Sequence, residues 1–297
     1  MTALILAALA LAPAPATATA QPPSDKHDDQ NPLYKRLLDT GLEVPGGKAI
    51  KFPAATMPDG LSAAQQKDII KKVIGSDYDF DEFTRDALVA PQVLRIGDVE
   101  SGDPKNPGRS VGVWFVVHGD FKQLEDDKFL DRLVTAGKGA NGKGGSLTAE
   151  QLAARKIEIK KGDEKREGYG TVEFDFLEKV RLKATGHAMW SRNGESVVAA
   201  AEIDPRFRGD KEFPNEWRSI VKAGGETKYG PPSPWGGASM YLKITRLSEP
   251  SGALFVEQHI VFAEPTGWFD GANLLRSKLP LAVQDSVRSM RKEFKKK

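Results

Sequence analysis

The most regular hydrophobic pattern in the chain lies between Asp270 and Phe294. Apolar residues recur there at steps of three and four, which places them on one side of an α-helix. They are Leu275, Leu279, Val283, Val287, Met290 and Phe294. The other side carries Gln284, Arg288, Arg291, Lys292 and Lys295. We therefore predict one long amphipathic helix with one face on a core and the other in water. Pro280 predicts a bend or a break near residues 277–280, because proline removes a helical hydrogen bond.

The segment just before this helix, Ala253–Phe262, is rich in β-branched and aromatic residues, which is typical of a β-strand. Alternation gives it one mainly apolar face, formed by Leu254, Val256, Gln258, Ile260 and Phe262. Pro265 and Gly267 then end the strand, because neither residue continues a ladder well. The end of the chain is thus predicted to be a strand, a Pro/Gly corner and a closing helix.

Shorter alternating patterns predict an antiparallel sheet upstream. The segments are Val93–Val99, Ser110–His118, Thr171–Trp190, Glu195–Ile203 and Met240–Ile244. Asn193-Gly194 joins two of them and is the strongest hairpin pattern in the chain. Residues 204–237 contain too much proline, glycine and charge for a strand, so we expect a long loop there, either functional or disordered. The prediction is an α+β fold in which six or seven antiparallel strands pack on the C-terminal helix.

Shorter helices are predicted by two capping boxes and one amphipathic pattern. Ser62-x-x-Gln65 opens a helix that presents Ile70 and Val73 on one side, and Thr148-x-x-Gln151 opens another. Residues 126–134 carry three inward-facing apolar positions. The domain is therefore expected to contain two or three helices besides the terminal one.

The first twenty residues contain no charged side chain. Leu4–Leu11 is an apolar run, and Ala18-Thr-Ala20 has the small-x-small pattern of a signal-peptidase site. The run is too short to span a bilayer, which takes about 20 residues. We predict a signal peptide over residues 1–20, cleavage near Ala20, and export to the periplasm or the extracellular space.

Residues 21–60 contain six prolines and are predicted to form an extended segment that covers the domain surface. The first ten of them, which include His27, have the composition of a disordered spacer. Residues 61–297 are then a single α+β domain, long enough to bury a sizeable core.

Charge and cysteine content narrow the function classes. The chain has 43 basic and 41 acidic residues, a formal net charge of +2, which argues against a nucleic-acid partner. It contains no cysteine, which excludes disulfides and thiol chemistry. Stability must therefore come from packing and hydrogen bonding.

A glycine-rich segment, Gly137–Gly144, contains G-x-G-x-x-G and resembles a phosphate-binding loop only superficially. A predicted helix precedes it instead of a strand, and Gly144 stands where a Mg²⁺-binding hydroxyl is required. We interpret it as a surface loop and expect no nucleotide or other cofactor.

Histidines and carboxylates leave an enzyme as an alternative. His118, His187 and His259 fall in separate predicted strands, where three imidazoles could in principle bind zinc. Four carboxylates could pair across a hairpin as in a glycosidase: Glu173, Asp175, Glu195 and Glu202. None has the spacing of a metal or catalytic motif, so we predict no metal site and no catalytic residue. A metal-dependent or carboxylate-based hydrolase stays the alternative.

Aromatic residues in or beside the predicted strands are candidates for a cavity under the terminal helix. They are Trp114, Phe174, Phe176, Trp190, Tyr241 and Phe262. A packed β-core uses the same residue types, so both interpretations stay open. Trp217 and Trp235, in residues 204–237, are predicted either to cover the cavity or to form the exposed patch of a surface or envelope interaction protein.

The end of the chain resembles START-like helix-grip proteins. The resemblance rests on Pro265-Thr-Gly-Trp-Phe269, Leu279-Pro-Leu-Ala-Val283 and Arg288-Ser-Met-Arg-Lys292. It implies a sheet curled around the C-terminal helix and a cavity for a lipid. The expected function is non-catalytic binding of a lipid or other apolar small molecule outside the cytoplasm. The basic end, Arg288–Lys297, could contact an anionic membrane surface, but cations at a helix C-terminus also complement the helix dipole, which we favour.

Overall fold

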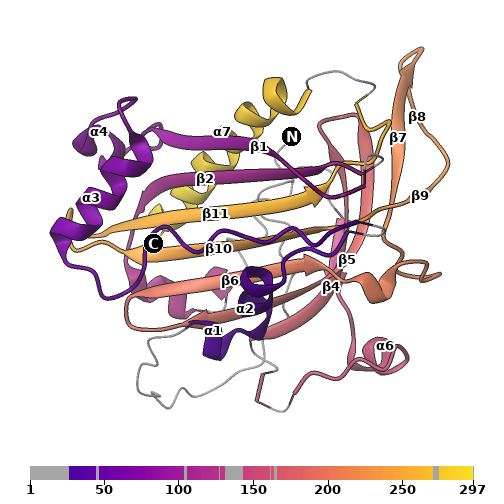
Figure 1. Ribbon diagram of the computed structural model, residues 1–297, viewed down its shortest axis with the longest axis horizontal. Helices are drawn as coiled ribbons and strands as arrows, with labels where there is room; N and C mark the ends of the chain where they lie inside the picture. The colour runs from indigo at the N-terminus through magenta and orange to yellow at the C-terminus, as the bar shows by residue number, and fades with distance from the viewer. Residues whose placement is uncertain are drawn as a thin grey trace.

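One antiparallel sheet of eleven strands organises the protein (Figure 1). The computed structural model describes residues 27–44, 47–103, 106–126, 128–130, 143–160, 162–163, 166–269 and 274–296. The main path of the sheet runs β1-β2-β11-β10-β6-β5-β4-β3, and β7 pairs with β5, β8 and β9. The strands are β1 (Gln92–Val99), β2 (Gly108–His118), β3 (Lys143–Ser146), β4 (Glu167–Phe176), β5 (Val180–Arg192), β6 (Ser196–Ile203), β7 (Glu216–Ala223), β8 (Glu226–Tyr229), β9 (Ser233–Pro234), β10 (Ala238–Arg246) and β11 (Ala253–Ala263).

Helices cover both faces of this sheet. They are α1 (His27–Gln30), α2 (Pro32–Asp39), α3 (Ala63–Ile74), α4 (Phe80–Thr84), α6 (Ala149–Ala153) and α7 (Leu274–Lys295), with 3-10 turns η1 (Phe121–Glu125) and η2 (Pro205–Phe207). Both predicted capping boxes are present, at Ser62–Gln65 and at Thr148–Gln151. None of the described helices is long and apolar enough to cross a membrane.

The predicted α+β class, with an antiparallel sheet and a C-terminal helix packed on it, is confirmed, but the predicted number of strands is wrong. Three extra strands, β7 to β9, lie within residues 204–237, where a loop was expected. Residues 171–190 form parts of two strands, because the chain turns back at Leu177–Lys179. Leu177 and Glu178 both have positive φ, 50° and 58°, a conformation that glycine or asparagine usually adopts. Neither residue is glycine or asparagine, so no turn was predicted there.

The inner face of the sheet packs on α7, which passes behind β1 and β2 in Figure 1. Its predicted apolar stripe is buried in the main core, and α7 continues through Pro280 without a break. The inner face of β11 is also as predicted: Leu254, Val256, Ile260 and Phe262 belong to the same core. Shape-complementary apolar packing thus holds this side of the sheet.

Arg291 corrects the predicted polar face of α7, because its side chain is only 3% exposed. Its Nε donates to Val116 O at 3.0 Å, and its Nη atoms donate to carbonyls of the segment between α4 and β1. These carbonyls belong to Leu88 (3.3 Å), Ala90 (2.6 Å) and Pro91 (2.9 Å). Burial lowers the pKa of this guanidinium to about 10. The position faces protein because residues 85–91 wrap over the end of the helix.

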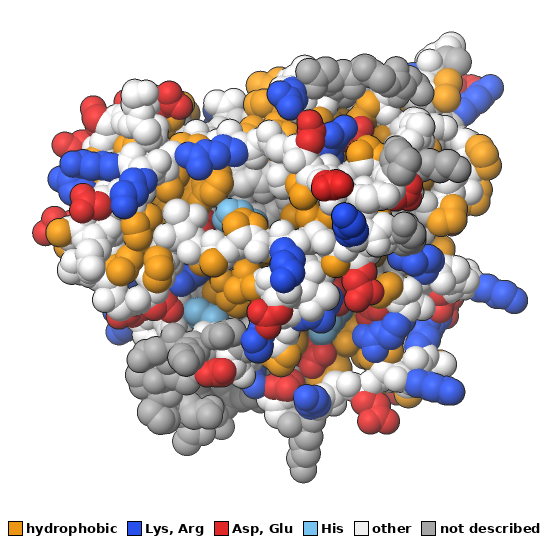
Figure 2. Space-filling model, viewed as in Figure 1, with side chains coloured by type: hydrophobic (Ala, Val, Ile, Leu, Met, Phe, Trp, Pro, Cys, Tyr) orange, Lys and Arg blue, Asp and Glu red, His pale blue; other side chains and the backbone are white. Residues whose placement is uncertain are grey.

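The N-terminal segment, residues 27–60, crosses the outer face of the sheet (Figure 1). Its apolar residues pack on the outward side chains of β5, β6, β10 and β11, with Leu33, Tyr34, Leu37 and Phe52 among them. Further along, α3 and α4 cover Trp114 and Phe255. Seen from this side, charged side chains of both signs are interspersed with apolar ones (Figure 2). The central strands are therefore buried on both faces.

Two predictions about the N-terminus have different outcomes. The predicted signal peptide, residues 1–20, lies outside the described residues, as does most of the glycine-rich segment before Lys143. His27, predicted to lie in a disordered spacer, is instead buried. Its ring nitrogens lie 2.8 Å from Ser191 Oγ and 2.6 Å from Ser196 Oγ. Tertiary hydrogen bonds, which composition does not show, order it.

Candidate functional site

A pocket of about 70 Å³ lies on the inner face, near the end of the sheet where β6 stops and β10 begins. Its lining residues come from β4, β5, β6, β10 and β11 and from the segments around Trp235 and Trp268: Val172, Phe174, Ala184, Gly186, Ala201, Glu202, Ile203, Trp235, Ala238, Ser239, Met240, Ile260, Phe262 and Trp268. Ala201 and Met240 belong to the inner core. Because side chains alternate along a strand, their neighbours Glu202 and Ser239 point outward and present only backbone here. The side chains of the pocket are therefore apolar or aromatic.

Trp268 forms the centre of an aromatic cluster that walls this pocket. Its ring lies 5.5 Å from that of Trp235 and 6.2 Å from that of Phe262, and Phe176, Trp217 and Phe269 also contact it, centroid to centroid. The Pro/Gly corner after β11 positions it: Trp268 N donates to Pro265 O at 3.2 Å, and Gly267 has a φ of 96° that few other residues adopt. The predicted corner thus delivers a tryptophan to the pocket.

The two tryptophans of this wall differ in how their indole N–H groups are bonded. Trp235 Nε1 donates to Ala263 O at 3.0 Å. Trp268 is 2% exposed, and its Nε1 has no hydrogen-bond partner among the described residues. An indole nitrogen can only donate, so Trp268 carries one buried donor that has no acceptor among the described residues.

The six aromatic residues predicted from the sequence do not lie together. Phe174 and Phe262 line the pocket, Phe176 contacts Trp268 behind it, and Trp190 lies elsewhere in the same core. Trp114 and Tyr241 lie on the outer face, where they donate to Thr56 Oγ1 (3.1 Å) and Pro53 O (3.0 Å) of the N-terminal segment. Both residues lie on central strands that are buried on both faces, so their aromatic character could not predict which face they occupy.

Trp268 was not predicted to be a pocket residue, although it stands in the Pro265-Thr-Gly-Trp-Phe269 corner. Trp235 and Trp217 were predicted to cover a cavity or to form an exposed patch. Trp235 is buried in the wall of the pocket, and Trp217 is partly buried and packs on Trp268. The patch predicted for a surface interaction protein is therefore absent at these two tryptophans.

A second, polar pocket of about 270 Å³ adjoins the first, and the two share Glu202, Ile203 and Trp235. Two of its three arginines face carboxylates: Arg36 binds Glu202, and Arg206 Nη2 lies 2.5 Å from Asp204 Oδ2. The hydrogen bond to Asp204 raises the pKa of Arg206 further above its ordinary value. Arg208 and Glu43 also line this pocket, which brings the total to three arginines and three carboxylates, so the pocket does not select one sign of charge.

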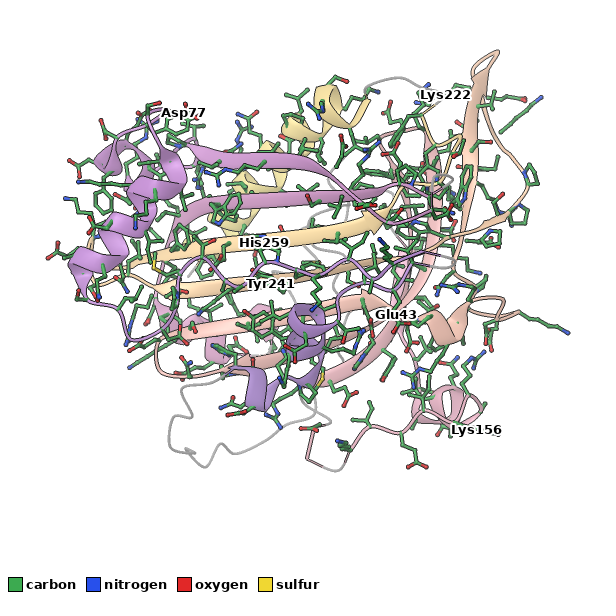
Figure 3. The ribbon with its side chains drawn as sticks, viewed as in Figure 1. Glu43, Asp77, Lys156, Lys222, Tyr241 and His259 are labelled. Atoms are coloured by element: carbon green, nitrogen blue, oxygen red, sulfur yellow. The ribbon has the colours of Figure 1, made fainter. Side chains whose placement is uncertain are left out.

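The three strand histidines do not meet. His118 Nε2 lies 2.8 Å from Thr84 O, and His259 stacks on Tyr241 at 4.8 Å between ring centroids (Figure 3). His187 Nε2 lies 2.8 Å from Glu167 Oε1, and Glu202 Oε1 is 3.9 Å from Nδ1. Within the part of the chain that the structure describes, no group of three or more potential metal ligands occurs.

Two of the strand histidines lie within 4 Å of a carboxylate: His187 beside Glu167, and His259, whose Nε2 is 3.5 Å from Glu257 Oε2. Neither lines either of the two pockets described above. Burial by itself would lower the pKa of His187, but the hydrogen bond to Glu167 and the charge of Glu202 outweigh burial and raise it. The same hydrogen bond lowers the pKa of Glu167. This arrangement is an ion pair within the structure, outside the two pockets described above.

The four carboxylates considered as a glycosidase pair are engaged elsewhere. Glu173 and Asp175 both contact Arg181, at 3.4 and 2.6 Å. Glu195 accepts from Gly60 N at 2.5 Å, and Glu202 binds Arg36. Each of the four carboxylates thus contacts a cation or a backbone amide.

Ser196, His27 and Asp59 bring together the residue types of an acyl-transfer triad, but not its geometry. Ser196 Oγ lies 2.6 Å from His27 Nε2, and Asp59 approaches the same nitrogen at 3.5 Å. A triad needs the carboxylate at the other nitrogen, which here faces Ser191 Oγ. Ser196 is 0% exposed, so no substrate reaches it. The cluster joins the N-terminal segment to the sheet.

Comparisons with known proteins do not establish a family. No family model and no curated protein matches the sequence. The structure is similar to the lipid transfer and protein localization domain of human StarD13 (DLC2), with a TM-score of 0.38 and 8% identity over 68% of this chain and 89% of that chain. It is also similar to an uncharacterised protein from Rhizobium leguminosarum, with a TM-score of 0.33 and 8% identity over 70% of this chain and 99% of that chain. Both TM-scores are below 0.5, so neither decides the fold family or the function, and the START-like resemblance stays a prediction.

Proposed function

We propose that the protein binds a lipid or other apolar small molecule, one end of which enters the pocket beside Trp268. The observation that carries this proposal is the pocket wall, which consists of aromatic and aliphatic side chains around an open space. Moving an apolar group from water into such a space contributes about 25 cal/mol per Å² of area buried. The pocket-lining side chains offer a ligand packing surface and no acid, base or nucleophile, which favours binding over catalysis.

The size of the pocket limits how much of a ligand it holds. Sites that enclose a small molecule usually measure roughly 300–1,000 Å³. The pocket measures about 70 Å³, which suffices for one end of a molecule. The rest of the ligand then lies outside it, beyond the aromatic wall.

Native mass spectrometry of gently purified protein, before and after organic extraction, tests this function. We expect a co-purifying mass that extraction removes. A matched pair of variants then locates it: Ala201→Val narrows the pocket, whereas Ala199→Val adds the same group on the same face of β6 outside the lining. We expect less bound mass in Ala201→Val only. A bare protein mass, or equal loading of both variants, contradicts the proposal.

We also propose that binding takes place outside the cytoplasm. The support is the apolar run and the small-x-small pattern in residues 1–20. The intact mass of protein expressed in a host with an export pathway tests it, with an expected loss of the segment up to Ala20. A full-length mass in the cytoplasmic fraction would contradict export.

A further inference from the structure

We propose that the part of the ligand that enters the pocket is an unbranched alkyl chain, and that Met240 is the residue that excludes rings and branched ends. The inference rests on the proposed function and specifies the shape of its ligand. The end of an acyl or alkyl chain meets this requirement, whereas a six-membered ring does not. Three observations carry it: the small residues that leave the pocket open, the side chains that close it, and its volume.

The pocket lies where small residues of neighbouring strands meet on the inner face. Four of its lining positions have a side chain of one carbon or none: Ala184, Gly186, Ala201 and Ala238. In the register of the sheet, Ala201 of β6 lies opposite Ala188 of β5 and opposite Met240 of β10. Protein interiors are otherwise packed with few spaces larger than a water molecule. The opening is therefore as narrow as the side chains that are missing from it, which suits a single alkyl chain.

Met240 and Ile260 close the pocket towards the middle of the sheet. They lie opposite each other on β10 and β11, and the next inward-facing pair, Leu242 and Gln258, lies outside the lining. Met240 is 8% exposed, and its Sδ accepts from Gln258 Nε2 at 3.9 Å, which directs its side chain towards that next pair. Met240 therefore stands between the pocket and the core behind it.

The volume of the pocket excludes a ring as long as Met240 is in place. An engineered apolar cavity that binds benzene measures about 150 Å³. This pocket measures about 70 Å³. Its aromatic walls are braced by ring contacts, with Trp268 6.2 Å from Phe262 and 5.5 Å from Trp235 between ring centroids. Met240 is the longest of the other apolar side chains in the lining, so its truncation is the change that most widens the pocket and leaves these walls intact.

Two alcohols with eight carbons each test this inference: 1-octanol, which ends in an unbranched chain, and 2-cyclohexylethanol, which ends in a ring. Each has a hydroxyl group at the opposite end, so the two differ mainly in the shape of the end that enters the pocket. Their affinities would be measured by titration calorimetry on purified protein freed of co-purifying ligand. Met240→Ala widens the pocket, and Met240→Val widens it less and serves if the alanine variant does not fold. Leu242→Ala is the matched control, because it truncates the next inward-facing residue of β10, outside the lining.

We expect the parent protein to bind 1-octanol at least about tenfold more tightly than 2-cyclohexylethanol, the discrimination that one misplaced methylene causes in an apolar pocket. In Met240→Ala that ratio should fall to about one, in Met240→Val it should fall part of the way, and in Leu242→Ala it should persist. Equal affinities in the parent protein overturn the inference but leave apolar binding intact. An unchanged ratio in the Met240 variants, or an equal fall in Leu242→Ala, overturns the role of Met240. Binding of neither alcohol to the parent protein overturns the proposed function itself.

Discussion

The two faces of the central strands are equally buried but are covered by different chemistry. On the inner face, β10 presents Met240, Leu242 and Ile244 to α7 and the main core. On the outer face the same strand presents Tyr241, Lys243 and Thr245, all buried beneath the N-terminal segment. The inner contact is apolar and non-directional, whereas the outer contact combines apolar packing with specific polar partners.

Hydrogen bonds fix the N-terminal segment on the outer face. Glu257, which is fully buried on β11, accepts from the backbone amides of Thr56 (2.6 Å) and Met57 (3.1 Å). Lys243 on β10 lies opposite Glu257 in the sheet and binds Asp59 Oδ1 at 2.8 Å. Apolar packing tolerates small shifts of one layer against the other, but these hydrogen bonds do not. The hydrogen bonds therefore fix which residues of the N-terminal segment lie opposite which residues of the sheet, whereas the inner layer is held by the fit of its side chains.

The largest effect is expected on the outer face, from Lys243→Met. Burial alone would raise the pKa of Asp59, but the hydrogen bond from Lys243, with those from Asn193 and Ser196, lowers it below its ordinary value. Removing the cation leaves the Asp59 carboxylate, whose side chain is only 13% exposed, without its charge partner, and the loss of one member of such a pair costs about 3–5 kcal/mol. Urea unfolding should show this loss in the free energy of unfolding.

Two variants sharpen the result for Lys243. The double variant Lys243→Met/Asp59→Leu should recover most of the loss, because an apolar pair can replace a buried ion pair. Lys222→Met should change the free energy of unfolding by less than about 0.5 kcal/mol, since the Lys222 side chain is 62% exposed. A double variant as unstable as the single one would mean that Lys243 and Asp59 stabilise the fold through contacts other than the one between them.

A somewhat smaller effect is expected on the inner face, from Leu279→Ala. Leu279 is fully buried between α7 and the sheet, so the substitution leaves a cavity and costs about 3 kcal/mol. Leu281, two residues along the helix, is 61% exposed, and Leu281→Ala should cost less than about 0.5 kcal/mol. Similar losses for both leucines, measured by urea unfolding, would contradict the placement of α7.

These two faces also separate what the sequence could predict from what it could not. The stripe of α7, the inner face of β11 and the two capping boxes follow from periodicity and local hydrogen bonding, and they are confirmed. Lys243 and Arg291 had the spacing of water-facing residues, yet both are buried. Their burial depends on segments distant in the chain, residues 27–60 and 85–91, which no local pattern reports.

The strands missed in residues 204–237 have a similar cause. Gly224-Gly225 is a hairpin pattern, and both glycines have positive φ, 61° and 83°. The flanking strands β7 and β8 are rich in charge, and β7 gains its place by pairing with β5. At the pocket, Phe174 and Phe262 were identified as aromatic strand residues, but the contact of Trp268 with Trp235 is a tertiary one.

The ion pair of His187 and Glu167, on the outer face, predicts that the free energy of unfolding depends on pH. We expect this change to be smaller than the loss from Leu279→Ala. The folded-state pKa of His187 is raised, so its contribution is complete below about pH 6.5, the unfolded pKa, and is lost as the pH rises through the folded value. The folded-state pKa of Glu167 is lowered, so its contribution is lost only as the pH falls through that lowered value. The pair therefore stabilises most in mildly acidic solution.

The variant His187→Gln tests that sign, because it retains a polar side chain but cannot titrate. Its deficit in the free energy of unfolding relative to the parent protein should shrink as the pH rises above about 6.5. The charged groups that face the ring are Glu167 and Glu202, and Arg36 binds Glu202 from α2. A deficit that grows with pH would mean that His187 is neutral in the folded protein.

The smallest expected effect compares the two tryptophans of the pocket wall in ligand-free protein. Trp235→Phe and Trp268→Phe remove similar ring volume from neighbouring positions, so their cavity costs should be close. Trp235→Phe also leaves Ala263 O without its donor, whereas Trp268→Phe removes a donor that has no partner. We therefore expect Trp235→Phe to be less stable than Trp268→Phe by about 1 kcal/mol in urea unfolding. Equal stability, or the reverse order, would show that Trp268 Nε1 is already hydrogen-bonded in the folded protein.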